Sequence, residues 1–168
     1  MTATEPDLTT ALCTRCGLCC DGSLFADVEL ASDGEASALE LMGAEVDDDD
    51  DGSVLLQPCA ALRHKRCTIY PHRPKCCRTF ECKLLQNVRR GRITLEEAKV
   101  QIADALNKVE EIKKLLGPSG RKSSDLSLKE RYLEALANEE SEDSSTIPLL
   151  QRAMASLEFL TVKTFLGR

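Results

Sequence analysis

The residues from Cys13 to Cys20, Cys-Thr-Arg-Cys-Gly-Leu-Cys-Cys, constrain this chain more than any other feature, because they hold four of its nine cysteines. The other five form a second group, and no cysteine lies outside the two groups: Cys59, Cys67, Cys76, Cys77 and Cys82. Cysteines this close together cannot all be core side chains of one helix or strand, although single cysteines often are. The dense thiols therefore indicate either disulfides or a metal site.

The N-terminus and the hydropathy pattern favour the metal site. Residues 1–8 contain neither the basic region nor the apolar region of a signal peptide. No apolar run reaches the roughly 18 residues that a transmembrane helix needs. We therefore expect a cytoplasmic protein without a membrane-spanning part, and in a reducing compartment clustered cysteines indicate metal binding or catalysis. The odd number of cysteines also fits poorly with complete disulfide pairing.

Length and composition predict an α+β chain in two parts. The 168 residues suffice for one domain, or for one domain with an appendage, and only 4% of them are aromatic. The core of the cysteine-rich half is therefore expected to be small, with metal supplying stability that packing cannot. We expect a cysteine-rich metal-binding domain of short strands and helices over residues 1–90. A helical C-terminal extension, a bundle or a hairpin, should follow over residues 91–168.

Short elements are predicted around the first group of cysteines. Cys13 to Gly17 has the form of a metal-binding knuckle, in which the glycine takes a positive φ and backbone N–H groups point at sulfur. Residues 24–30 are predicted to form a strand, and Ser32 with Glu35 predicts a capped helix through residue 41. The acidic run Asp47 to Asp51 is predicted to be a solvated loop, because the ligand pattern of a calcium loop is missing.

A hairpin and a helix are predicted around the second group. Residues 54–57 and 67–70 are expected to be strands joined across the basic turn at residues 63–66, in a hairpin that carries Cys59 and Cys67. Prolines at positions 71 and 74 end the second strand. One short helix is then expected to carry the last three cysteines and to run on to about residue 89.

The second half is predicted to be helical and to carry no chemistry of its own. Thr94 with Glu97 forms a capping box, and apolar residues follow at alternating steps of three and four, typical of a seam against one partner helix: Leu95, Ala98, Ile102, Ala105, Val109, Ile112 and Leu116. A shorter helix capped by Ser127 should run to about residue 137, between linkers at 119–124 and 139–145. Pro148 fits the first turn of a last helix, whose seam is Leu150, Ala153, Leu157 and Leu160. These seams are expected to form a core; the alternative is a dimerising coiled coil, and a protein partner could bind through this helical half.

The cysteine spacing leaves zinc and an iron–sulfur cluster both open. Cys13, Cys16 and Cys19 are two residues apart, as are three ligands of a [4Fe–4S] cluster. The ferredoxin repeat then requires a fourth cysteine where this chain has Ser23, so a cluster would take its fourth ligand from the second group. One tetrahedral zinc needs four ligands, so eight thiolates would fill two sites. Thiolates are soft ligands that suit both metals.

A basic segment accompanies the second group of cysteines. The segment from Cys59 through Arg92 contains ten Lys or Arg residues, with Glu81 as its only acid. Cations stabilise an anionic thiolate centre, and we expect them to surround the metal. The alternative is a patch for nucleic acid, against which the scarcity of aromatic residues argues. The two histidines, His64 and His72, are expected at the surface or around the metal, since the thiols alone can provide its ligands.

The two cysteine groups together resemble the CxxCxxCC, or YkgJ-like, family of zinc- or iron-chelating domains. The matching motifs are Cys13-x2-Cys16-x2-Cys19-Cys20, Pro58-Cys59, Cys67-Thr68-Ile69-Tyr70 and Arg73-Pro74-x2-Cys77-Arg78-x-Phe80-x-Cys82. The resemblance covers about residues 13–85 and makes Cys76 an extra thiol. It implies that eight cysteines hold the metal: Cys13, Cys16, Cys19, Cys20, Cys59, Cys67, Cys77 and Cys82.

The same resemblance implies two classes of activity without naming a substrate. The family is similar to iron–sulfur proteins described as oxidoreductases, and its motif also occurs in flagellin lysine methylases. The methylases are much longer, and this chain has no separate methyl-donor site that the sequence identifies. We therefore expect a metal-binding protein with a redox or catalytic role for zinc or an iron–sulfur cluster. The alternative is a zinc-stapled module that binds a protein or nucleic acid without catalysis.

Overall fold

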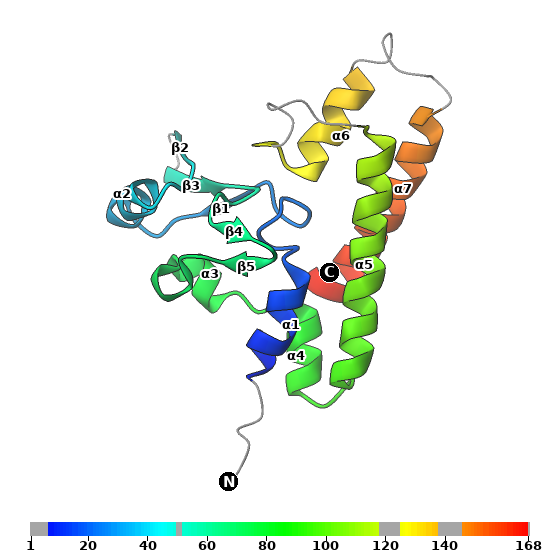
Figure 1. The fold of residues 1–168 in the computed structure, drawn as a ribbon, viewed down its shortest axis with the longest axis horizontal. Helices are drawn as coiled ribbons and strands as arrows, with labels where there is room; N and C mark the ends of the chain where they lie inside the picture. The colour runs from blue at the N-terminus through cyan, green and yellow to red at the C-terminus, as the bar shows by residue number, and fades with distance from the viewer. Residues whose placement is uncertain (1–6, 50–51, 118–124, 138–145, 168) are drawn as a thin grey trace.

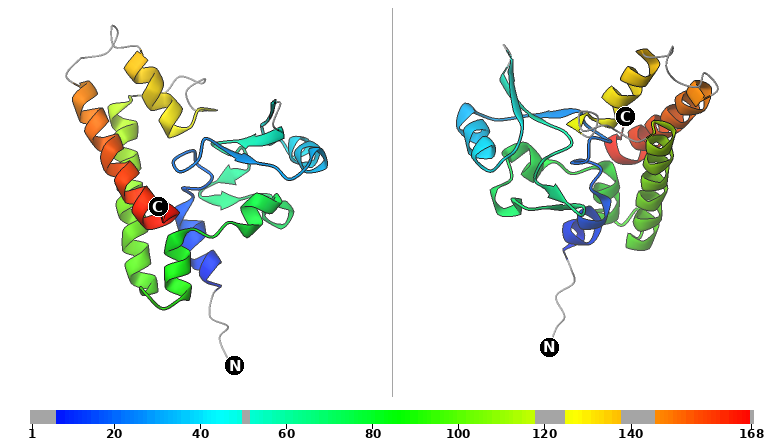
Figure 2. Two further views of the ribbon diagram at one scale, coloured as in Figure 1. Left: turned by 180° about the vertical axis from the view of Figure 1, so that it is seen from behind. Right: turned by 45° about the horizontal axis from the view of Figure 1, so that its top comes forward.

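The protein has a mixed α+β structure, as predicted, with short strands in its first half and long helices in its second (Figure 1). The structure is a computed structural model that describes residues 7–49, 52–117, 125–137 and 146–167. The strands lie to one side and the long helices to the other in Figures 1 and 2. Helices α1 (Leu8–Cys16) and α4 (Lys83–Arg89) lie where the two sides meet, and both contact helix α5 (Leu95–Leu115).

The helical side is built on the seam predicted from the sequence. Helix α5 begins with the predicted capping box, in which Glu97 N donates to Thr94 Oγ1 at 3.2 Å and Thr94 N donates to Glu97 Oε2 at 2.7 Å. Its apolar stripe packs on α7 (Thr146–Thr161) and on the buried Phe165 of the following π-helical turn η3 (Val162–Leu166). The buried seam residues of the two helices are Ala98, Ile102, Ala105, Val109, Ile112, Leu150 and Leu157. The same hydrophobic cluster includes Leu12, Leu18, Leu84 and Leu85, which precede α5 in the sequence.

Helix α6 (Leu128–Ala137) begins against the first cysteine group. Ser127 is buried and exchanges capping hydrogen bonds with Glu130, as predicted. The N–H of Leu128 donates to the carbonyl of Gly22 at 2.9 Å. Gly22 has a φ of +77°, and a Cβ there would lie 2.9 Å from the Cα of Ser127. Only a residue without a side chain therefore fits at this crossing. The linkers predicted at 119–124 and 139–145 lie outside the described residues.

A three-stranded antiparallel sheet forms the opposite side, in the order β1 (Asp27–Glu29), β3 (Gly52–Leu56), β2 (Val46–Asp49). Its first strand is shorter than the predicted span of 24–30. Leu55 pairs with Val28 on one side and Val46 on the other, and packs with Leu39 of helix α2 (Asp33–Leu41). Ser32 caps α2 as predicted, accepting a hydrogen bond from Glu35 N.

The prediction of a solvated loop at Asp47 to Asp51 was wrong for its first three residues. Asp47, Asp48 and Asp49 continue strand β2 and pair with residues 52–54 of β3. Val46 packs against the small cluster under the sheet, which sets the register of the aspartates that follow it. The side chains of Asp47 and Asp48 stay exposed, so their charges remain solvated. Residues 50 and 51 lie outside the described part of the chain.

The predicted hairpin is present but smaller, and Cys59 is not part of it. Strands β4 (Leu62–Arg63) and β5 (Arg66–Cys67) pair around the two-residue turn His64-Lys65, where both residues have positive φ. Such tight turns join strands directly, so pairing starts at residue 63 and leaves the 54–57 segment to the larger sheet. After Cys67 the chain turns into a 3₁₀ turn, η1 (Tyr70–His72), instead of the predicted strand to residue 70.

The single helix predicted for the last three cysteines is two helices. Helix α3 (Lys75–Thr79) ends at Phe80, whose backbone is extended and whose ring packs edge-to-face on Phe25 at 5.4 Å. Helix α4 then starts after Cys82. This aromatic contact holds the break between the helices, and it needs partners 55 residues apart in the sequence. No helix within the described residues is both long and apolar enough to cross a membrane.

Candidate metal centre

All nine cysteines line one cavity of about 910 Å³. They reach it from α1, the loop after α1, the segment before β4, strand β5, helix α3 and the start of α4. Cys13 is exposed, whereas the other eight are half-buried, and no cysteine forms a disulfide. The fold therefore brings the two cysteine groups, more than 35 residues apart in sequence, to one place.

Helix α1 and the glycine after it position the first group. Asp7 caps the helix, and Cys13 and Cys16 are one turn apart, so their side chains share a face. Gly17 ends the helix with a φ of +73°, and its N–H donates to the carbonyl of Cys13 at 3.3 Å. The predicted knuckle is thus a helix C-terminus followed by a left-handed glycine. The chain then turns back so that Cys19 and Cys20 also reach the cavity.

Backbone hydrogen bonds join the second group to the first. The N–H of Cys59 donates to the carbonyl of Cys20 at 2.8 Å, and the N–H of Leu62 donates to the carbonyl of Cys59 at 2.9 Å. Leu62 in turn pairs with Cys67 across the small hairpin. Cys20, Cys59 and Cys67 are therefore held together by main-chain contacts that do not depend on metal.

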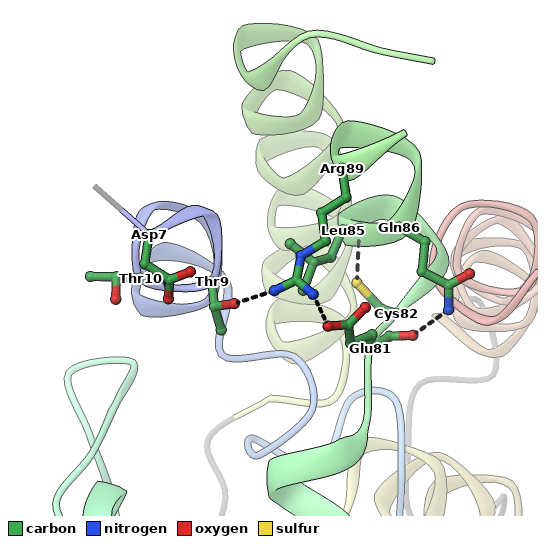
Figure 3. Close-up of polar contacts among 8 residues, drawn as sticks. All are labelled: Asp7, Thr9, Thr10, Glu81, Cys82, Leu85, Gln86 and Arg89. Atoms are coloured by element: carbon green, nitrogen blue, oxygen red, sulfur yellow. Dashed lines mark hydrogen bonds and ion pairs between the residues drawn. The ribbon is translucent and has the colours of Figure 1, made fainter. Parts of the chain in front are cut away.

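Cys82 lies at the N-terminus of α4 and caps it, as Figure 3 shows. The N–H of Leu85 donates to Cys82 Sγ at 3.5 Å. Arg89 forms an ion pair with Glu81 and donates to Thr9 Oγ1 at 3.3 Å, which ties α4 to α1 (Figure 3). Cys82 is thereby placed beside the cysteines of α1.

Cys76 and Cys77 are neighbours on α3, with their Sγ atoms 3.9 Å apart. Their hydrogen bond lowers the pKa of Cys76 to about 7 and raises that of Cys77. Glu35 holds the start of α3, because its Oε1 accepts a hydrogen bond from Lys75 N at 2.7 Å. This contact fixes Cys77 against the sheet side of the molecule.

Six other cavity thiols are harder to ionise than a free cysteine: Cys13, Cys16, Cys19, Cys20, Cys59 and Cys82. Burial raises the pKa of Cys16 and Cys20 to about 12, and it also raises the pKa of Cys19 well above its usual range. Neighbouring thiols add to the effect, because several thiolates close together repel one another. A metal ion reverses this balance, since a coordinated thiol is deprotonated. The cavity thus favours protonated thiols until a cation is bound.

Five cationic side chains lie around the cavity: Lys65, Arg66, Arg73, Arg78 and Arg89. Arg73 stacks 3.6 Å above the ring of Tyr70 and donates from Nε to the Tyr70 carbonyl at 3.2 Å. Its guanidinium also donates to the carbonyl of Cys77 at 3.4 Å. Arg73 and Arg89 oppose the rise in the pKa of Cys13 that partial desolvation at the cavity rim and Cys82 cause. These cations are placed to offset the charge of bound thiolates.

The donor set fits zinc or iron, although the side chains are not closed around an ion. Among the residues that the structure describes, no three Cys, His, Asp or Glu side chains already form a metal-holding group. A tetrahedral zinc with Zn–S bonds of about 2.3 Å needs sulfurs about 3.8 Å apart. Metal binding would therefore require the cysteine side chains to rotate inward. His64 and His72 are exposed and do not line the cavity, in line with a thiolate site.

Three features of the site were not predicted from the sequence. These are the capping role of Cys82, the stacking of Arg73 on Tyr70, and the side chain of Gln57 in the cavity wall. Gln57 is only 3% exposed, and its Oε1 has no hydrogen-bond partner among the described residues. A buried acceptor of this kind fits a cavity that holds a further polar group. The position of Cys82 directly before Lys-Leu-Leu could have suggested that it caps a helix. No local sequence signal predicts the Arg73–Tyr70 stacking or the place of Gln57 in the cavity wall.

Comparison with known proteins gives a family and no individual relative. No curated protein and no solved structure matches the chain. The CxxCxxCC family, described as "Putative zinc- or iron-chelating domain", matches residues 12–112, which is more than half of the chain. The match includes all nine cysteines and most of helix α5. The chain belongs to the CxxCxxCC family.

Proposed function

We propose that this protein binds zinc or an iron–sulfur cluster through cavity thiolates, in the reducing cytoplasm. The candidate ligands are Cys13, Cys16, Cys19, Cys20, Cys59, Cys67, Cys77 and Cys82. The observation that carries the proposal is the convergence of all nine cysteines, from six separate segments, on one cavity. Packing alone does not explain why so many thiols gather in a place where burial opposes their ionisation. Metal binding explains this gathering, because it exchanges the thiol protons for a cation.

Residues 1–90 would supply the ligands, and residues 91–168 would form a helical extension that supports them. The contacts favour this division of roles. Cys16 and Cys82 pack against the hydrophobic cluster that contains the α5 and α7 seams. Because that cluster is shared, the two parts are expected to fold together, and experiments should use the full chain.

We further propose a redox or catalytic use for the metal. One structural zinc needs four thiolates, whereas this cavity offers twice that number besides Cys76. A volume of about 910 Å³ is also within the range of small-molecule sites. An iron–sulfur cluster would supply one-electron transfer, and zinc would supply Lewis-acid chemistry. Arg73 and Arg89 would offset thiolate charge beside Cys13, and Gln57 would accept a hydrogen bond within the cavity.

The second candidate is a zinc-stapled interaction module without catalysis. Large apolar side chains on the helical side are exposed, including Val100 at 69% and Phe159 at 71%. Such residues could contact a protein partner, and in that case the metal would only hold the fold. Nucleic acid is the weaker alternative for this module, since the cations around the cavity lie beside thiols whose charge they would neutralise.

Anaerobic purification followed by metal analysis and visible spectroscopy tests the proposal. A broad visible absorption that bleaches on reduction is expected for an iron–sulfur centre with a redox role. A colourless protein with tightly held zinc and no change on reduction would favour the interaction module. Protein that is folded, reduced and free of both metals, and that takes up neither, would contradict metal binding itself. The Cys76→Ser variant serves as a control, because it changes a thiol outside the proposed ligand set.

A further inference from the structure

The eight candidate ligands line one cavity, and the elements and contacts that hold them there divide them into two sets of four. The first set is Cys13, Cys16, Cys19 and Cys82, and the second set is Cys20, Cys59, Cys67 and Cys77. Each set combines cysteines from both sequence groups. The sequence order of the cysteines therefore does not describe the division.

The first set lies where α1 meets α4. Cys13 and Cys16 share a face of α1, and Arg89 ties α4 to α1 through Thr9 (Figure 3). The electrostatic neighbours agree with this placement. After burial, Cys82 adds to the raised pKa of Cys13 and Cys16, and Cys16 adds most to that of Cys19, ahead of Cys20, Cys82 and Cys13.

The second set lies between the small hairpin and α3. Main-chain hydrogen bonds link Cys20 to Cys59, and the β4–β5 pairing places Cys67 beside them. The pKa of Cys20 is raised first by burial and then by Cys59 and Cys67, which have the largest electrostatic effects on it. After Cys76 and burial, Cys20 and Cys59 also raise the pKa of Cys77.

The two hydrophobic clusters separate four of the eight cysteines in the same way. Cys16 and Cys82 pack against the helical cluster, whereas Cys59 and Cys77 pack against the cluster under the sheet. The sets meet at Cys19 and Cys20, which are adjacent in sequence, and Cys20 adds to the raised pKa of Cys19. Cys13 also acts on Cys20, but after Cys59, Cys67 and Asp21. The boundary between the sets thus follows the boundary between the clusters.

We infer that the protein holds two separate four-thiolate metal centres, one formed by each set, and not one centre shared by all eight cysteines. The inference rests on the proposed metal binding. With zinc as the probe, each centre would exchange four thiol protons for one Zn²⁺ and carry a net charge of about −2. The first centre would join α1 to α4, and the second would join the loop after α1 to the hairpin and α3.

Alkylation of partly loaded protein tests the division on the unaltered chain. Reduced metal-free protein receives one equivalent of Zn²⁺, is alkylated, and is analysed by intact mass and peptide mapping. Molecules with one zinc should carry five labels, on Cys76 and on all members of one set. Four protected thiols drawn from both sets, or eight protected in a single step, would overturn the division. Zinc that protects no thiol would instead contradict metal binding itself.

Matched serine variants give a second, independent measurement of metal per chain. Cys82→Ser and Cys67→Ser should each lower the metal content about twofold, and the Cys16→Ser/Cys82→Ser pair should lower it no further. The Cys67→Ser/Cys82→Ser pair, with one change in each set, should remove it all. Equal losses from the two double variants would indicate a single shared centre. Cys76→Ser should keep the full content, and circular dichroism confirms that each variant is folded.

Discussion

The Sγ atom of Cys82 accepts a hydrogen bond from the N–H of Leu85 at 3.5 Å, so one side chain caps helix α4 and also faces the thiol cavity. Serine is among the best N-cap residues, whereas alanine cannot cap. Cys82→Ser should therefore remove a metal ligand and keep the cap, and Cys82→Ala should remove both. In metal-free protein we expect the alanine variant to be about 1 kcal/mol less stable than the serine variant.

Urea unfolding in the presence of a chelator measures this difference. Both variants should lose the same amount of metal in a parallel analysis, because each lacks the thiolate. Equal unfolding midpoints for the two variants would mean that Cys82 does not stabilise α4.

Cys76 and Cys77 should differ sharply in their effect on metal content, although they are neighbours in sequence. Cys77 packs with the cluster under the sheet, whereas Cys76 is outside the ligand set that the family motif implies. Cys77→Ser should lose metal, and Cys76→Ser should retain it. Because its pKa is lowered to about 7 by the hydrogen bond with Cys77, Cys76 should also be alkylated fastest in the metal-free protein at neutral pH. Equal metal losses, or slow alkylation of Cys76, would contradict this assignment.

The metal-free protein should lose stability at alkaline pH. The folded state raises the pKa of Cys16 and Cys20 from 9.0 to about 12, chiefly through burial. Stability from a raised pKa is fully present below the unfolded value and is lost as the pH rises through the folded value. We therefore expect the unfolding midpoint of metal-free protein to fall between about pH 9 and about pH 12.

The metal-loaded protein is the matched control for this pH dependence. Its ligand thiols are already deprotonated, so the thiol contribution to the alkaline loss should be absent. Effects of pH on the other residues are common to both forms, so the difference between the two curves isolates the cysteines. Parallel curves would show that the cavity thiols are not metal ligands.

Local signals explain which parts of the fold could be predicted from the sequence. The caps at Ser32, Thr94 and Ser127 depend on residues three positions apart, and the structure contains all three. The α5 seam was predicted because its period belongs to a single helix. The length of the hairpin was not predicted correctly, because it depends on whether residues 54–57 pair with the hairpin or with the sheet. The break between α3 and α4 depends on Phe25, far away in the sequence.

The same distinction applies to the candidate site. The spacing of the cysteines and the family motif identified candidate ligands, but they contain no information about which thiols are neighbours. That grouping depends on the packing of α1 on α4 and on the backbone contact of Cys20 with Cys59. Both contacts join segments about 40 residues or more apart, and only the folded chain brings them together.

Gly22→Ala should destabilise the protein more than Gly43→Ala. Both glycines have positive φ, at +77° and +81°, so alanine is strained at either position. A Cβ at Gly22 would also lie 2.9 Å from the backbone of Ser127, whereas the space around Gly43 is open. We expect a loss of about 1 kcal/mol at Gly43 and about 2–4 kcal/mol at Gly22, measured by urea unfolding. Equal losses would mean that the crossing of the first cysteine loop with α6 is not tightly packed.

Removal of metal should loosen the ligand-bearing elements and leave the helical seam intact. Helices α5 and α7 are held by buried apolar residues such as Ile102, Val109 and Leu150, which do not depend on thiols. Helix α1 and the β4–β5 hairpin are short, and among their described residues only Leu12 of α1 is fully buried, so they depend more on cross-linking by metal. Hydrogen exchange after chelation should therefore accelerate about tenfold or more in α1, α4 and the hairpin, which corresponds to about 1.4 kcal/mol of lost protection. Exchange in α5 should change little, and unchanged exchange in α1 and β5 would show that no metal holds them.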